Sequence, residues 1–153
     1  MDIEERILKK GIELPPTTEP MANYISVSRT GNLLYTSGAS CFKEGVPVYQ
    51  GRLGEELTVE EGYEASRLTA LNIISNLKKE CGSLNRIKKI VKMLAFVNSA
   101  DSFTQQPEVI NGASDLFMEI FGEKGKHARS AIGTNVLPFH IPVEIELIVE
   151  INE

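Results

Sequence analysis

The chain is 153 residues long, with 42% hydrophobic and 24% charged residues, a composition typical of a folded globular protein and not of a disordered one. Its 16 basic and 21 acidic residues give a net charge of −5, which does not supply the basic surface that a nucleic-acid-binding protein needs. No apolar run approaches the roughly 20 residues of a membrane span, and residues 1–6 lack a signal peptide's layout. We therefore expect one cytoplasmic domain over residues 1–153, with 1–22 as an irregular N-terminal arm and with no nucleic acid or membrane as a partner.

The first predicted structure is a β-hairpin. Residues 24–28 alternate apolar and polar side chains, Gly31 and Asn32 supply a turn, and residues 33–37 continue as a strand. A shorter strand candidate at 46–49 ends in a glycine-rich segment.

A long helix is predicted next. Thr58 and Glu61 form a capping box, and the apolar residues that follow recur at spacings of three, four and seven as far as Cys81. Gly82 is placed to end this helix.

The remainder of the chain reads as strand, helix, strand, strand. Residues 90–97 are apolar at nearly every position, which is typical of a strand buried on both faces. Pro107 fits the first turn of a second helix, and Gly122 lies beyond its end. Residues 129–136 and 143–151 alternate as strands do. This order predicts an α+β fold, a single mixed sheet of about six strands with two helices on one face.

Two helices cover only one face of such a sheet. The second face must therefore meet water or another subunit, and the apolar residues of 90–97 favour a subunit. We expect an oligomer.

Metal binding is not expected. Cys41 and Cys81 stand apart without a CxxC motif, and His127 and His140 are the only imidazoles. A zinc site rich in histidine or cysteine would need nearly all four residues in one place.

Arg129 is the strongest candidate functional residue. It shares a strand face with Ala131 and Gly133, whose small side chains leave room beside the guanidinium. A guanidinium with open space suits bidentate capture of a carboxylate. An ion pair with a glutamate of the last strand, Glu144, Glu146 or Glu150, is the alternative, and those glutamates could also simply face solvent.

If the last two strands form a hairpin around 137–142, Arg129 lies opposite Glu150. Arg129 and Glu144 would then be about six residues apart along the ladder, roughly 20 Å. On that condition, the two groups share a site only across a subunit boundary.

The C-terminal residues resemble a known family signature. His127-Ala-Arg-Ser-Ala131, then Leu137-Pro138, then Val143-Glu-Ile-Glu146 is similar to the Pro-Ala-Arg-Ser, Leu-Pro and Ile/Val-Glu-Ile-Glu pattern of the Rid family, the YjgF-type reactive-intermediate deaminases formerly called L-PSP endoribonucleases. Earlier segments are similar as well: Asn23-Tyr24 through Gly31-Asn32 to Thr36-Ser37-Gly38, and 111–121 as the second helix.

The resemblance implies a chorismate-mutase-like α+β fold and a homotrimer with its sheets inside and three ligand clefts between subunits. It implies that Arg129 holds the carboxylate of a 2-imino or enamino acid and that Glu144 positions the attacking water. It also places Tyr24, Ser37, Gly38, the Ala131 backbone N–H and Asn111 as substrate-binding candidates. No metal or organic cofactor is implied, because an iminium carbon is already electrophilic.

This chain also departs from the family pattern. Ala131 stands where the family commonly has cysteine, and Ala22-Asn23-Tyr24 replaces Gly-Pro-Tyr. Residues 134–136 and 139–142 differ too, and they resemble a longer, less characterised branch of the family.

Four functions follow as hypotheses. The first is an imine deaminase that releases ammonia and a 2-keto acid, a hydrolase acting on C=N bonds. The second is a non-catalytic trimer that binds small carboxylates. The third, an endoribonuclease, is disfavoured by the acidic charge and the two histidines, and chorismate mutase is supported by fold alone.

Overall fold

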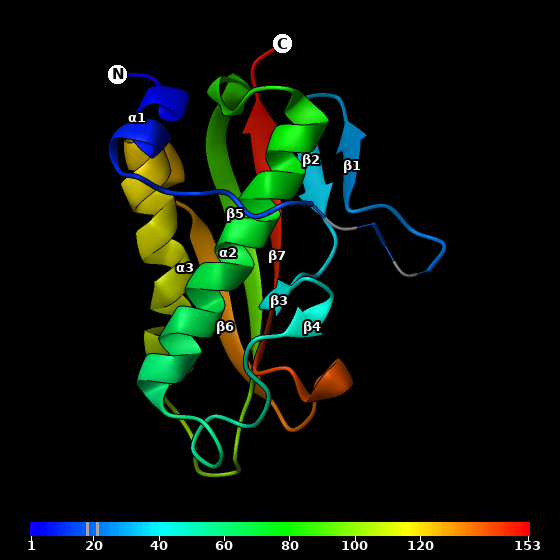
Figure 1. Cartoon of the computed structure of the whole chain (residues 1–153), viewed down its shortest axis with the longest axis vertical. Coiled ribbons are helices and arrows are strands. Elements are labelled where there is room, and N and C mark those ends of the chain that lie inside the picture. Colours follow the sequence, from blue (N-terminus) through cyan, green and yellow to red (C-terminus); the bar gives the residue numbers. More distant parts are fainter. Residues whose placement is uncertain (18, 21) are drawn as a thin grey trace.

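The computed structural model describes residues 1–17, 19–20 and 22–153. Figure 1 shows a twisted sheet with helices packed across one face. The helices are α1 (Ile3–Lys9), α2 (Val59–Cys81) and α3 (Gln106–Phe121), and the strands are β1 (Val27–Thr30), β2 (Leu33–Thr36), β3 (Phe42–Lys43), β4 (Val46–Pro47), β5 (Ile87–Asn98), β6 (Ala128–Thr134) and β7 (Val143–Ile151). Three short 3₁₀ helices, η1 (Leu84–Arg86), η2 (Gly122–Gly125) and η3 (Pro138–His140), complete the order. The predicted α+β class is confirmed.

The main sheet has five strands in the order β1-β2-β7-β5-β6. Strands β5 and β6 are parallel, and the other neighbours are antiparallel. The expected sixth strand, near 46–49, instead forms a separate two-stranded sheet, in which β4 pairs with β3. The turn between β3 and β4 has positive φ at Glu44 and Gly45, which matches the turn preferred by two-residue hairpins.

Strand β7 shows why the helices lie where they do. Every second residue, from Val143 to Ile151, is almost fully buried, and the residues between them are partly or fully exposed. This period of two gives the sheet one apolar face, which α2 and α3 cover side by side (Figure 1). The opposite face carries glutamates of β7 together with Tyr35, Leu94, Phe96 and Ile132.

The close approach of α2 and α3 explains a glycine inside a helix. A Cβ at Gly112 would overlap the Tyr63 carbonyl oxygen of α2. The two helices are also joined by a hydrogen bond from the Tyr63 hydroxyl to Asp115 of 2.7 Å and by an ion pair between Arg67 and Glu119 of 3.2 Å. Gly112 therefore sets the spacing of the helix layer, although glycine weakens an isolated helix.

Helix α1 lies in the segment expected to be irregular, so that part of the prediction was wrong; residues 18 and 21 of the arm are outside the described residues. The helix begins with a capping box between Asp2 and Glu5, and Ile3 and Ile7 are buried. Asp2 followed three residues later by Glu5 is a capping box as well, and a search for capping boxes that begin with serine or threonine misses it.

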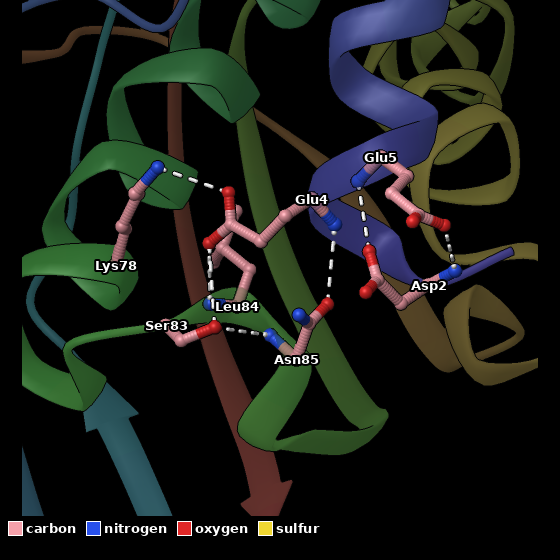
Figure 2. Close-up of polar contacts among 7 residues, drawn as sticks. All are labelled: Asp2, Glu4, Glu5, Lys78, Ser83, Leu84 and Asn85. Carbon is pink, nitrogen blue, oxygen red and sulfur yellow. Dashed lines mark hydrogen bonds and ion pairs between the residues drawn. The ribbon is translucent and has the colours of Figure 1, made fainter.

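Glu4 ties α1 to the end of α2 and to η1, as Figure 2 shows. Its carboxylate accepts from the Leu84 backbone N–H at 2.9 Å and from the Lys78 ammonium at 3.0 Å. Its own backbone N–H donates to the Asn85 side chain at 3.1 Å. Burial acts to raise the pKa of Glu4, but the hydrogen bonds from Leu84 and Lys78 outweigh it, so the pKa lies below its ordinary value.

Within the described ranges, no helix combines the length and the apolar character needed to cross a membrane.

We expect Gly112→Ala to lower the free energy of unfolding by about 3 kcal/mol, because the added methyl must push α3 away from α2. Denaturant unfolding monitored by circular dichroism measures this. Glu108→Ala, at an exposed position of the same helix, is the control for side-chain changes on α3. A Gly112→Ala variant as stable as the wild type would mean that the two helices do not pack as closely as described.

Glu4→Gln should cost about 1 kcal/mol at pH 7 and nothing near pH 2. A lowered folded-state pKa stabilises the fold above the ordinary glutamate pKa, and this contribution is lost as the pH falls through the folded-state value. Thermal unfolding of both proteins across this pH range gives the comparison. Glu13→Gln, at an exposed position, is the matched control for the substitution itself and should leave the stability at pH 7 near the wild-type value.

Candidate functional site

Arg129 lies near the start of β6, the strand at one edge of the sheet. In register it is level with Met93 of β5, which is fully buried under the helices, so its side chain points to the helix side. The guanidinium is half-buried and donates from Nη1 to the Ser114 hydroxyl at 3.0 Å and from Nη2 to the Pro107 carbonyl at 3.5 Å. Both partners belong to α3.

No carboxylate of the residues that the structure describes lies within 4.0 Å of this guanidinium. The alternative of an ion pair with Glu144, Glu146 or Glu150 is therefore wrong within one chain, and Glu150 pairs instead with Lys88 at 3.4 Å. Arg129 remains a positive charge held in place by neutral groups.

Two other predicted residues lie on the same side. Asn111 sits one turn beyond Pro107 and one turn before Ser114, so helical spacing places it on the α3 face that contacts Arg129. Ala131 follows Arg129 by two residues on the same strand face and packs against the core.

Glu144 lies near the start of β7 on the opposite face of the sheet. In register it is level with Phe96 of β5, which in turn is level with Ile132 of β6. Burial raises the pKa of its carboxyl, and the charge of Glu146 raises it further. A glutamate of this kind accepts a proton closer to neutral pH than an exposed one does.

Gly38 is brought directly against Glu144. A Cβ at Gly38 would lie 2.7 Å from Oε2 of Glu144 and 3.0 Å from its Cγ, so the carboxylate occupies the space that any side chain at 38 would fill. The neighbouring backbone pairing between Ala39 and Ile145, with two hydrogen bonds of 2.9 Å, holds this segment beside β7.

Ser37 and Tyr24 lie on the same flank of the sheet but do not contact Glu144 in the hydrogen bonds described. The Ser37 hydroxyl donates to the Ile25 carbonyl at 2.7 Å and so joins the end of β2 to the segment before β1. Tyr24 is 54% exposed.

The hairpin on which the spacing argument was conditional, between residues 129–136 and 143–151, does not form. Strand β5 lies between β6 and β7, because the chain crosses the end of β5 through η3, where Asn98 N–H donates to the Pro142 carbonyl at 2.8 Å. Arg129 and Glu144 are three residues apart along β5, about 10 Å, and on strands two positions apart, about 9.6 Å. They also lie on opposite faces, so one chain does not bring them together.

Sequence reasoning missed Ser114, which contacts Arg129, and His127, which contacts Ser114. The Ser114 hydroxyl lies 2.9 Å from Nε2 of His127, whose Nδ1 lies 2.6 Å from the Gly125 carbonyl. Two weak signals existed: Ser114 follows Asn111 by three residues on a helix, and His127 precedes Arg129 by two residues, just before β6 begins.

A cavity of about 300 Å³ lies elsewhere, between α1 and the end of α3, with Ile3, Arg6 and Phe121 among its lining residues. Among the residues that the structure describes, no group of three or more histidine, cysteine, aspartate or glutamate side chains is placed to hold a metal.

The family described as "YjgF/chorismate_mutase-like, putative endoribonuclease" matches residues 4–151. The chain belongs to the YjgF/Rid family. The resemblance found in the sequence is thus confirmed, and with it the chorismate-mutase-like fold.

Three relatives cover nearly the whole chain. Protein TCP17 of Trypanosoma cruzi is 42% identical over 151 residues, which are 98% of this chain and 94% of the relative. The crystal structure of a protein named a putative endoribonuclease from Shewanella oneidensis is 40% identical, with a TM-score of 0.94 over 99% of this chain and 100% of that one. The crystal structure of a protein of unknown function from Agrobacterium tumefaciens is 39% identical, with a TM-score of 0.89 over 99% of this chain and 92% of that one.

Gly38→Ala should displace the Glu144 carboxylate and lower any activity that depends on it about tenfold, with little loss of stability because a flexible side chain yields. Turnover and melting temperature are measured together. The double variant Gly38→Ala/Glu144→Ala serves as the control and should be no less active than Glu144→Ala alone. Independent, multiplicative losses would contradict the shared space.

Proposed function

We propose that this protein is a 2-imino or enamino acid deaminase. The enamino acid tautomerises to the iminium form, R–C(=NH₂⁺)–COO⁻, and water adds to its carbon. The resulting carbinolamine expels ammonia once a proton has moved from oxygen to nitrogen. The products are a 2-keto acid and ammonium, so atoms and charge balance without a redox step.

The observation that carries the proposal is the state of Arg129. Its guanidinium is half-buried, oriented by two neutral acceptors, and not neutralised by a carboxylate among the described residues. Such a cation is suited to a small substrate that brings its own carboxylate, since a planar guanidinium pairs with both oxygens at once.

Glu144 supplies the second requirement of the reaction. As the base it orients the water and takes up its proton, and a raised pKa brings this carboxyl closer to the pH at which that transfer is efficient. Gly38 leaves the carboxylate room, and the neighbour of Glu144 in register on β5 is the apolar Phe96.

The two groups meet only if a second copy contributes one of them. We propose a homotrimer in which Arg129 of one chain and Glu144 of the next line a shared cleft, with Tyr24, Ser37 and Gly38 on the Glu144 side and Asn111 and Ala131 on the Arg129 side. Support comes from the sheet face that no helix covers. Two large hydrophobic side chains on it, Tyr35 and Ile132, are 41% and 45% exposed, and a subunit interface would bury them.

An RNA substrate fits this site less well. The chain carries a charge of −5, and a phosphate-binding groove draws its affinity from clustered lysine and arginine. The "endoribonuclease" in the name of the Shewanella relative applies to that protein.

The test measures pyruvate and ammonia released from freshly generated 2-aminoacrylate. Arg129→Ala and Glu144→Gln should each lower kcat/KM about 100-fold, because one removes the anchor and the other the base. Arg29→Ala is the control, since that arginine lies exposed on β1, where it donates a hydrogen bond to the Gly31 carbonyl. Wild-type rates in Arg129→Ala would contradict the proposal.

Mixing the two inactive variants tests the shared cleft. When Arg129→Ala and Glu144→Gln chains are unfolded and refolded together, some clefts receive both intact residues from different chains, so activity should return. No return of activity would contradict the shared cleft. Calorimetric binding of 2-oxobutanoate that depends on Arg129, without any turnover by the wild type, would instead support a non-catalytic carboxylate-binding protein.

A further inference from the structure

We propose that Ser114 and His127 are positioning residues that hold the Arg129 guanidinium in the orientation that receives a substrate carboxylate. This inference rests on the proposed role of Arg129 as the carboxylate anchor. The geometry that carries it is a series of three hydrogen bonds that ends in the backbone of η2.

The series runs through three elements of the fold. Arg129 on β6 lies 3.0 Å from the hydroxyl of Ser114 on α3, and that hydroxyl lies 2.9 Å from Nε2 of His127. Nδ1 of His127 lies 2.6 Å from the Gly125 carbonyl oxygen. The guanidinium of an edge strand is thereby tied to the helix layer.

The direction of each hydrogen bond follows from the chemistry of the groups. A guanidinium only donates, so the Ser114 oxygen accepts from it. The Gly125 carbonyl only accepts, so Nδ1 of His127 carries a hydrogen. In a neutral imidazole Nε2 is then the acceptor, and it takes the hydroxyl hydrogen of Ser114. One assignment of hydrogens satisfies all four groups.

The imidazole itself is fixed by the core. Its ring packs edge-on against Phe117, with the ring centroids 5.7 Å apart and the planes at 89°. Phe117 is fully buried on the same helix as Ser114. Rigidity of the core therefore extends through His127 and Ser114 to a side chain that reaches the surface.

The arrangement leaves the guanidinium able to bind. Ser114 and the Pro107 carbonyl each accept from a different terminal nitrogen, and a guanidinium has five N–H groups. Within residues 1–17, 19–20 and 22–153 no other acceptor takes its N–H groups, which leaves three for a bidentate carboxylate. Without Ser114, the long arginine side chain would have to be ordered at the moment of binding.

The test compares Ser114→Ala and His127→Phe with the wild type. Phenylalanine keeps a ring against Phe117 but removes both nitrogens. Ser114→Ala should weaken calorimetric binding of 2-oxobutanoate about tenfold, the effect of ordering one side chain. With 2-aminoacrylate as substrate it should raise KM and leave kcat unchanged, because Glu144 is on the other face. The ¹⁵N relaxation of the Arg129 Nε–H should show greater motion in both variants, with or without ligand.

A double-mutant cycle separates this role from a general loss of structure. Ser114→Ala/His127→Phe should bind no more weakly than Ser114→Ala alone, because both act through one series. Asp115→Ala, one residue along α3 and directed to Tyr63, should leave the affinity and the Arg129 motion unchanged. Ser114→Thr, which restores a hydroxyl, should recover most of the affinity.

Three results would overturn the inference. Unchanged affinity and unchanged Arg129 motion in Ser114→Ala would remove the positioning role while leaving the anchor intact, provided that Arg129→Ala abolishes binding. Additive losses in the cycle would show that Ser114 and His127 act separately. Equal 2-oxobutanoate binding by wild type and Arg129→Ala would overturn the anchor, and the positioning role with it.

Discussion

Strand β5 is hydrogen-bonded along both of its edges, to β6 in parallel and to β7 antiparallel, and the position of each candidate group follows from this double pairing. A parallel partner requires a crossover, which α3 provides, and the crossover lays α3 over β5 and β6. Arg129 then faces the underside of α3, while the register of β7 turns Glu144 to the other face. If β6 and β7 were neighbours in a hairpin, Arg129 would lie opposite Glu150 and about six residues along the ladder from Glu144.

Helix α3 has two roles in this arrangement. Its inner residues pack into the core and its Gly112 allows α2 to approach, while the face directed to β6 supplies Pro107 and Ser114 to Arg129. Stability and binding geometry thus depend on the same sixteen residues of helix. A shift of α3 against the sheet is therefore expected to move the Arg129 guanidinium, because both of its hydrogen-bond partners lie on α3.

Much of the fold could be predicted from local signals. The capping box at Thr58, the glycine after each long helix and the alternation of β7 are read within a few residues, and the structure has them where they were expected. The pairing of β6 with β5 was not predicted, because β6 and β7 are adjacent along the chain and such strands commonly form a hairpin. The strand-helix-strand order of β5, α3 and β6 was the better guide, since such units are parallel.

The site, too, could be predicted only in part. Gly38 and Glu144 were found through a resemblance, but that they share one volume, and that Ser114 contacts Arg129, depends on long-range packing that no local pattern contains.

The contact between Gly38 and Glu144 has a consequence for the family as a whole. Because the carboxylate fills the space of a side chain at 38, the two positions cannot vary independently. In a related chain with a larger residue at the position of Gly38, the glutamate at the position of Glu144 must turn away or be replaced by a shorter side chain, and glycine becomes dispensable once the glutamate is lost. Covariation of these two positions would therefore sort family members into those that retain the carboxylate in this location and those that have given it up.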